Sequence, residues 1–329
     1  MDELLIGGLL ASTLRVSTPL ILGALAAVIS ERAGVIDLGL EGKMLLSAFA
    51  AGAVGAVTGS LPLALLGALL VGVALAMLHG YACVSHTGDQ VVLGMALSMI
   101  ASGLSIVLGI AWFKQGGQTP PLPNDVRLSP WFLGAADALQ GVPVIGPVIG
   151  PIVGGGLLGH NFLVYLALAL VPVVWAFLYR TRLGLRLRAT GENPAMVDAA
   201  GLSVKGLRYG ALALNGVLCS LAGSYLVLAQ GANFVPNMTA GRGYMALAAM
   251  IFGNWRPVAA LWACLLFGFL DAVAIRLQGV VLPAALGGGV VPVQAIQALP
   301  YVLTVVLLAG FIGRSRAPAA LGTPYVKER

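Results

Sequence analysis

The chain has 329 residues, of which 59% are hydrophobic and only 9% are charged. A soluble domain carries roughly 25% charged residues, so this composition excludes a soluble enzyme, a disordered protein and a nucleic-acid-binding protein. Long unbroken apolar runs, a mean hydropathy of +0.97 and 45 glycines instead predict an all-α polytopic membrane protein with closely packed helices.

Apolar runs predict about nine (roughly eight to ten) transmembrane helices, since a spanning helix needs about 20 apolar residues. Two of the runs, 17–30 and 241–254, are short, and we expect broken or partly re-entrant helices there. The stretch 4–16 contains Arg15 and is expected to be interfacial or to extend the first span. The full set of candidate spans is 17–30, 40–59, 61–84, 89–113, 161–179, 207–230, 241–254, 257–277 and 293–313.

Basic residues predict the orientation of the chain in the membrane. Lysine and arginine gather in the loop 180–205 and in the tail 315–329, and short loops rich in these residues face the cytoplasm. Four predicted spans separate the two segments, so both assignments agree. We therefore expect a cytoplasmic C-terminus, an outer N-terminus and an extracytoplasmic connection over 114–160. The net charge of +6 reflects this loop bias.

An internal repeat is visible at an offset of 201 residues. The run GKMLLSAFAAG at 42–52 aligns with GYMALAAMIFG at 243–253. The predicted topology makes these segments run in opposite senses, as in the inverted repeats of many transporters. We expect a single transmembrane domain over 1–329, built from the two halves 1–113 and 205–314.

The loop 180–205 predicts a short helix outside the membrane. Asn193 is a suitable N-cap and Pro194 suits the first helical position. Gly201 is a natural C-terminal stop. From these residues alone, the helix is either a surface connection between two spans or a docking helix for a cytoplasmic partner.

Three further segments place polar residues near membrane depth. The segment 31–43 is either a plain loop or a hinge that brings Asp37 or Glu41 to a solute pathway, because ionisable residues within membranes are usually functional. In 230–244, aromatic rings could contact a flat solute, although a loop that caps the next helix is the simpler interpretation. For Asn215, inside a span, an interhelical hydrogen bond is the simpler role. The candidate pathway residues are Asp37, Glu41, Gln90, Asn215, Phe234, Asn237 and Tyr244.

Cysteines and histidines do not predict a metal site. The three cysteines lie far apart within apolar runs, which favours neither a disulfide framework nor a zinc site. His79, His86 and His160 have no second ligand at metal-binding spacing. We also find no grouping typical of a nucleophilic catalyst.

Four segments of the sequence resemble permease subunits of bacterial ABC importers. These segments are ERAGVIDLGLEGKMLL, RATGENPAMVDAAGLSV, NMTAGRGYMALAAMIFGNWRPVAA and LPYVLTVVLLAGFIGRSRAPAALGTPY. The resemblance covers nearly the whole chain and is to the inner-membrane translocator family of ribose-type sugar and branched-chain amino-acid permeases. Within that family it is closest to the nucleoside and simple-sugar branch, which works with basic-membrane-protein lipoprotein receptors.

This resemblance implies a type II-like importer permease in the bacterial inner membrane. Such a subunit pairs with a second permease, identical or different, above two cytoplasmic ABC ATPase subunits and below an extracytoplasmic substrate-binding lipoprotein. ATP and Mg²⁺ would bind to the ATPase subunits, so we expect neither cofactor nor hydrolytic residues in this chain.

The resemblance also assigns the loop 180–205 to coupling with the ATPase. The family commonly has Asn where this chain has Asp37, which puts a shared role for that position in doubt. The residues at the matching positions of the coupling helix are Glu192, Asn193, Pro194, Asp198, Ala199 and Gly201.

The substrate expected from the resemblance is a nucleoside, with a simple sugar or a branched-chain amino acid as alternatives. A stand-alone secondary transporter or channel is the alternative from another class. It would need membrane-embedded carboxylates, for which Asp37, Glu41 and Asp271 are the candidates. The triplet Thr87-Gly88-Asp89 only faintly resembles an intramembrane aspartyl protease, because no partner aspartate motif accompanies it.

Overall fold

The computed structural model describes residues 2–131, 156–277 and 316–327, with the single residues Val153, Ala298 and Val302. The predicted span 293–313 and part of the connection 114–160 lie outside the described residues. Within the described ranges the regular structure is helical, and strand-like pairing is limited to one isolated bridge between Pro130 and Asn161.

Seven described helices are long and apolar enough to cross a membrane, and an eighth apolar helix is shorter. This agrees with the predicted all-α polytopic fold and with a total near nine. The first half contains α1 (Asp2–Arg32), α2 (Leu40–Thr58), α3 (Leu61–Gly80) and α4 (Gln90–Phe113). The second part contains α7 (Phe162–Arg180), α8 (Arg182–Glu192), α9 (Pro194–Ala199), α10 (Val204–Tyr225), α11 (Arg242–Phe252) and α12 (Pro257–Leu277). Single π-helical turns, Tyr81–Ser85 and Leu226–Gln230, extend α3 and α10.

The first helix is continuous, so the expectation of a short broken helix at 17–30 is wrong. The alternative, that 4–16 extends the first span, is confirmed by α1. Polar side chains in this stretch are satisfied within the helix itself. Thr13 Oγ1 donates to the Leu9 carbonyl at 2.8 Å, and Thr18 Oγ1 donates to the Leu14 carbonyl at 2.7 Å. Such bonds let polar residues sit in a spanning helix without an unpaired group.

Helices α1, α2 and α10 form the interior of the protein. Over the most apolar 18-residue stretch of each span, 83% of the residues are buried in α1, and 78% are buried in α2 and in α10. The buried share is only 22% in α3 and in α4. Leu25, Met44, Leu218 and Met250 from four helices meet in one apolar cluster. Because α3 and α4 expose long apolar faces, they suit contact with lipid or with another membrane subunit.

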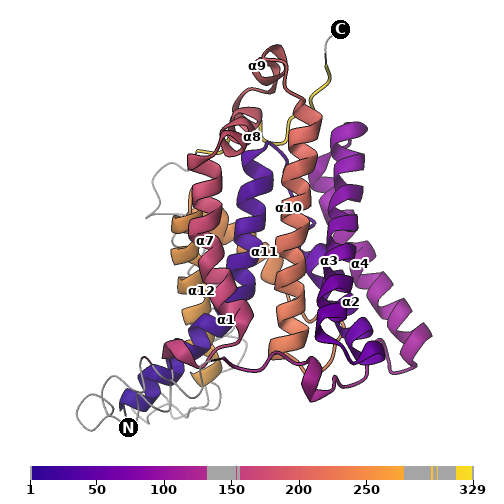
Figure 1. Ribbon diagram of the computed structural model, residues 1–329, viewed down its shortest axis with the longest axis vertical. Coiled ribbons are helices and arrows are strands. Elements are labelled where there is room, and N and C mark those ends of the chain that lie inside the picture. The colour runs from indigo at the N-terminus through magenta and orange to yellow at the C-terminus, as the bar shows by residue number, and fades with distance from the viewer. Residues whose placement is uncertain are drawn as a thin grey trace.

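The two ends of the helix bundle differ in charge. The N-terminus lies at one end, whereas α8, α9 and the C-terminal tail lie at the other (Figure 1). We call the latter the basic end, because Arg180 at the end of α7 and the three arginines of α8 are there. The predicted placement of the two termini on opposite sides agrees with this arrangement.

Helices α2 and α11 start beside each other and run in opposite directions. Glu41 at the start of α2 contacts Gly241 and Gly243 at the start of α11. From there α2 runs toward the end where Gly55 meets Val126. Helix α11 instead runs to the basic end, where the following turn contacts the last residue of α1. This is the opposite sense that the repeat predicts, while the equivalence of 1–113 and 205–314 stays a prediction.

Candidate functional site

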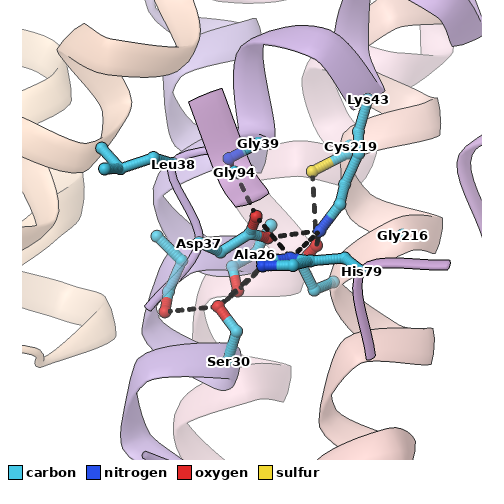
Figure 2. A network of polar contacts seen from close by, with 12 residues as sticks. Ala26, Ser30, Asp37, Leu38, Gly39, Lys43, His79, Gly94, Gly216 and Cys219 are labelled. Atoms are coloured by element: carbon cyan, nitrogen blue, oxygen red, sulfur yellow. Dashed lines mark hydrogen bonds and ion pairs between the residues drawn. The ribbon is translucent and has the colours of Figure 1, made fainter. Parts of the chain in front are cut away.

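A buried polar network lies where the chain turns from α1 into α2. Asp37 lies in the non-helical segment between these helices, Lys43 on the first turn of α2, His79 at the end of α3, and Asn215 within α10. All four side chains have no exposed surface. Figure 2 shows Asp37, Lys43 and His79 pointing toward one another between the helices.

The network is centred on an ion pair. Lys43 Nζ donates to Asp37 Oδ2 at 2.5 Å and to Asn215 Oδ1 at 3.1 Å. His79 Nδ1 lies 3.2 Å from Asp37 Oδ1, and the Gly39 backbone N–H donates to the same oxygen at 3.1 Å. The carboxylate therefore has partners on both oxygens, which is what a buried charge requires.

Asn215 connects this ion pair to α1. Its Nδ2 donates to the Ala26 carbonyl at 3.0 Å and to Ser30 Oγ at 3.3 Å. The interhelical hydrogen bonds expected for Asn215 are therefore present, and the network joins α1, α2, α3 and α10.

Sequence reasoning missed Lys43 and His79 as members of this network. The signal for Lys43 was present, since a lysine within an apolar run needs a buried partner. His79 carries no such signal because 36 positions separate it from Lys43, and only the packing of α3 against α2 and α10 brings it close.

A second contact joins the two halves of the chain at Glu41. Its Oε1 accepts from the Gly241 N–H at 2.8 Å, and its Oε2 accepts from the Gly243 N–H at 2.6 Å. A carboxylate at a helix N-terminus pairs with free N–H groups and with the helix dipole. A Cβ at Gly243 would lie 2.6 Å from the Glu41 backbone nitrogen, so this close approach requires glycine.

Three other candidate pathway residues have well-defined partners. The side chain of Gln90 accepts from the Ile36 N–H at 2.7 Å, and Asn237 Oδ1 accepts from Ser102 Oγ at 2.7 Å. Phe234 is fully buried and packs edge-on against Phe49, with ring centroids 5.2 Å apart. This position fits the simpler interpretation of 230–244 as a structural loop.

The start of α11 has three candidate residues near it. Glu41 contacts it directly, Asn237 precedes it by five residues, and Tyr244 lies in its first turn and is 44% exposed. The structure thus separates six of the seven candidates into two groups, while Phe234 lies apart from both in apolar packing against Phe49. Asp37 and Asn215 belong to the buried network, with Gln90 against the adjoining segment. The second group, Glu41, Asn237 and Tyr244, lies near the start of α11.

The short helix predicted in the loop 180–205 is present as α9 at the basic end. Asn193 Oδ1 accepts from the Met196 N–H at 3.1 Å, and Pro194 is the first helical residue. Gly201 follows with φ +78°, a conformation that favours glycine. Val197 is buried, whereas Met196 is 70% exposed, so most of α9 faces away from the bundle.

The C-terminal tail holds the segment around α9 in place. Lys327 Nζ lies 3.2 Å from Asp198 Oδ1, and Glu192 Oε2 accepts from the Ala319 N–H at 3.2 Å. The Ala320 N–H donates to the Gly191 carbonyl at 2.8 Å. These contacts span more than 100 residues of sequence, so sequence reasoning did not find them.

The same tail reaches the turn between α1 and α2. The Gly322 N–H donates to the Gly34 carbonyl at 3.2 Å, and a guanidinium nitrogen of Arg208 in α10 donates to the Thr323 carbonyl at 3.1 Å. Residues 316–327 therefore connect the segment around α9 to the turn that carries Asp37.

Metal-ligating side chains do not cluster in the described ranges. No group of three or more histidine, cysteine or acidic residues there is placed to hold a metal ion. The expected absence of a metal or cofactor site stays a prediction.

Comparison with known proteins places this arrangement in a family. Residues 9–312 match the model of the family described as branched-chain amino acid transport system / permease component. A guanosine ABC transporter permease of Bacillus subtilis is 34% identical, over 96% of this chain and 95% of its own length. A nucleoside ABC transporter permease of Lactococcus lactis is 35% identical, over 98% of this chain and 97% of its own.

A third relative has a different substrate in its name. A provisionally named glucose ABC transporter permease of Haloferax volcanii is 35% identical, over 98% of each chain. Because the family match and these alignments cover nearly the full length, the seven spanning helices and the network described above lie within the shared domain. The chain is therefore a multi-pass membrane permease that belongs to the branched-chain amino acid transport system / permease component family.

Proposed function

We propose that this chain is the membrane-spanning permease subunit of an ABC importer for nucleosides. The observation that carries the proposal is the nearly full-length similarity to two permeases whose names specify guanosine or nucleosides. The fold agrees, since it combines buried inner helices with a short exposed helix at the basic end. ATP hydrolysis is assigned to separate ATPase subunits that carry ATP and Mg²⁺.

The basic end is the cytoplasmic end in this proposal. Arg180 ends α7, and α8 contributes three more arginines at 182, 186 and 188. Such residues are retained on the cytoplasmic side during insertion. The C-terminal tail lies at the same end (Figure 1). The opposite end, with the N-terminus, then faces an extracytoplasmic substrate-binding lipoprotein.

Helix α9 is the docking element for the ATPase. Its exposed side chains can enter a groove on a partner, while the buried Val197 anchors it to the permease. The tail contacts of Asp198 and Glu192 hold it at a fixed place. The proposed coupling residues are Glu192, Asn193, Pro194, Asp198, Ala199 and Gly201.

Movement of α9 would reach the interior through the turn between α1 and α2. Gly191, in the last turn of α8, leaves no room for a side chain against the Arg32 backbone, and the tail bonds to Gly34. That turn leads into the Asp37–Lys43 pair and then to Glu41. ATP binding can shift the permease only through contacts that differ between its two states. We assign this change to the contacts of Gly191 and of the tail with the turn between α1 and α2.

The solute pathway runs between this permease and a second, identical or different, permease subunit. Glu41, Asn237 and Tyr244 near the start of α11 are the residues we assign to its wall. The wall is supported by four buried residues that do not face the pathway: Asp37, Gln90, Asn215 and Phe234. Inverted-repeat transporters place their sites where broken helices begin, which matches the meeting of α2 and α11.

Replacing Asp198 with arginine tests the coupling role. We expect about a ten-fold loss of ATP-driven guanosine uptake, because reversing a charge at a docking surface disturbs its match with the partner and a cost of about 1.4 kcal/mol is a factor of ten. Uptake and ATPase activity are measured together in proteoliposomes that contain the full complex. Basal ATPase activity should remain while its link to uptake is lost.

The charge-swapped variant Asp198→Arg/Lys327→Asp is the matched control. It restores an ion pair with the tail but leaves the altered charge on α9. If uptake returns in this variant, the pair with the tail alone explains the loss. Normal transport by Asp198→Arg would show that α9 has no docking role.

A simple sugar is the second candidate substrate, favoured by the similarity to the glucose-named permease. Competition in the same uptake assay separates the two. Excess unlabelled guanosine should suppress labelled guanosine uptake, whereas excess glucose should leave it unchanged. Uptake of labelled glucose, with no uptake of labelled guanosine, would assign the chain to sugar import.

A further inference from the structure

A pocket of about 620 Å³ opens at the basic end between α7, α8 and the start of α12. It lies apart from the buried network and from α9. Three arginines and three aromatic residues give it its character: Arg32, Arg188, Arg256, Trp175, Tyr179 and Trp262.

The charge in this pocket is not neutralised by the described residues. None of the described lining residues is acidic. Arg32 and Arg188 each use Nε on a backbone carbonyl, at 3.0 Å in both cases. Arg256 is exposed, and within the described ranges its side chain has no hydrogen bond or ion pair. Glu31, next to Arg32, is buried and already accepts from the Trp255 indole at 2.6 Å.

The aromatic residues of the pocket are those typical of the level of lipid headgroups. Trp175 and Tyr179 lie in the last turns of α7, and Trp262 lies in the second turn of α12 and is 68% exposed. Trp and Tyr gather at membrane interfaces because one part of the ring is apolar and another polar. The Arg188 guanidinium lies 4.7 Å from the centre of the Tyr179 ring, which holds its charge beside the pocket.

We propose that this pocket binds the phosphate group of an anionic phospholipid from the leaflet at the basic end. Arginine suits this ligand because its planar guanidinium donates two parallel hydrogen bonds to phosphate oxygens. Basic pockets between spanning helices on the cytoplasmic side bind anionic headgroups. The first turn of α12 also lines the pocket, and its partial positive charge adds to that of the arginines.

The test is lipid binding to the purified full complex in detergent. Phosphatidylglycerol is titrated and bound lipid is counted by native mass spectrometry, with phosphatidylcholine as the uncharged comparison. Arg256→Gln should weaken phosphatidylglycerol binding about five-fold, since one basic residue near an anionic surface contributes about 1 kcal/mol. Arg188→Gln should weaken it at least as much. Phosphatidylcholine should not bind at this site.

Arg186→Gln is the matched control, because Arg186 is an exposed arginine on α8 that does not line the pocket. It should bind phosphatidylglycerol as the unchanged protein does. An equal loss in this control would mean diffuse surface attraction and would overturn the proposal. Unchanged binding by Arg256→Gln would also overturn it.

Two further outcomes identify a different occupant. Displacement of the lipid by millimolar inorganic phosphate would assign the pocket to a free anion. If Arg256→Gln instead releases the ATPase subunits while lipid binding is unchanged, the pocket belongs to an acidic protein partner. Each result would contradict a lipid site.

Discussion

At the scale of single residues, the molecule depends on a few charges that its interior holds in fixed pairs. Lys43 and Asp37 are fully buried 2.5 Å apart, and Asn215 and His79 complete their surroundings. Removing one member of a buried pair leaves an uncompensated charge, which is far more costly than removing both. The pair therefore fixes the turn between α1 and α2 in one position relative to α2 and α10.

Lys43→Met should lower the free energy of unfolding by about 3–5 kcal/mol, because Asp37 would stay buried without its cation. Thermal unfolding of the purified protein in detergent measures the loss. The double variant Asp37→Asn/Lys43→Met should recover most of it. Lys205→Met, a change at an exposed lysine of α10, should have little effect. Equal losses in the single and double variants would contradict the pairing.

His160 makes stability depend on pH at the end opposite the basic end. Burial lowers the pKa of this imidazole below its usual value of 6.5, and the nearby Arg15 adds to the effect. Between 6.5 and the lower folded pKa, the unfolded chain binds a proton that the folded chain does not. Stability from this group is therefore present above pH 6.5 and falls as the pH decreases.

His160→Gln should flatten that dependence. The fall in Tm between pH 7.5 and pH 5.5 should be smaller in this variant than in the unchanged protein, because the group that takes up the proton on unfolding is gone. His86→Gln, a change at an exposed histidine, should keep the original slope. An unchanged slope in His160→Gln would show that this residue is not the cause.

At the scale of elements, the contact between α2 and α11 is the feature that joins the two halves. Glu41 binds two free N–H groups at the start of an 11-residue helix. A helix this short is marginal without tertiary contacts. The carboxylate therefore both begins α11 and fixes its distance from α2.

Glu41→Gln should loosen the start of α11. The amide has one acceptor oxygen and no charge, so one charge-assisted bond is lost outright, at a cost of about 1.5–3 kcal/mol. Hydrogen exchange should become faster over residues 241–245, while α12 keeps its protection. Glu192→Gln, at a carboxylate that contacts the tail, should leave α11 unchanged. Full protection in Glu41→Gln would contradict the role given to this carboxylate.

Elements were predictable where their signals are local. The cap at Asn193, the proline after it and Gly201 lie within nine residues of one another, and α9 forms between them. The full length of α1 was harder to predict, because its hydroxyl residues lower the hydropathy of the sequence. In the structure Thr13 and Thr18 donate to backbone carbonyls one turn earlier, so they do not interrupt the helix. The tail contacts and the position of His79 depend on packing between distant segments, so no local pattern encodes them.

At the scale of the whole molecule, the proposal is that events at the basic end govern access to a site deep in the membrane. The tail contacts α9 through Lys327 and Asp198, and it contacts the turn after α1 through Gly322 and Gly34. The turn carries the buried ion pair, and Glu41 lies one turn further along the chain. A connected set of contacts therefore runs from the proposed ATPase surface to the meeting point of the two halves.

The most direct test of this account is uptake of labelled guanosine into proteoliposomes that contain the full complex and its binding protein. ATP is supplied on the side of the basic end. The account predicts uptake only when ATP and the ATPase subunits are both present. Uptake by this permease alone, driven by an ion gradient without any ATPase subunit, would contradict it and identify a secondary transporter.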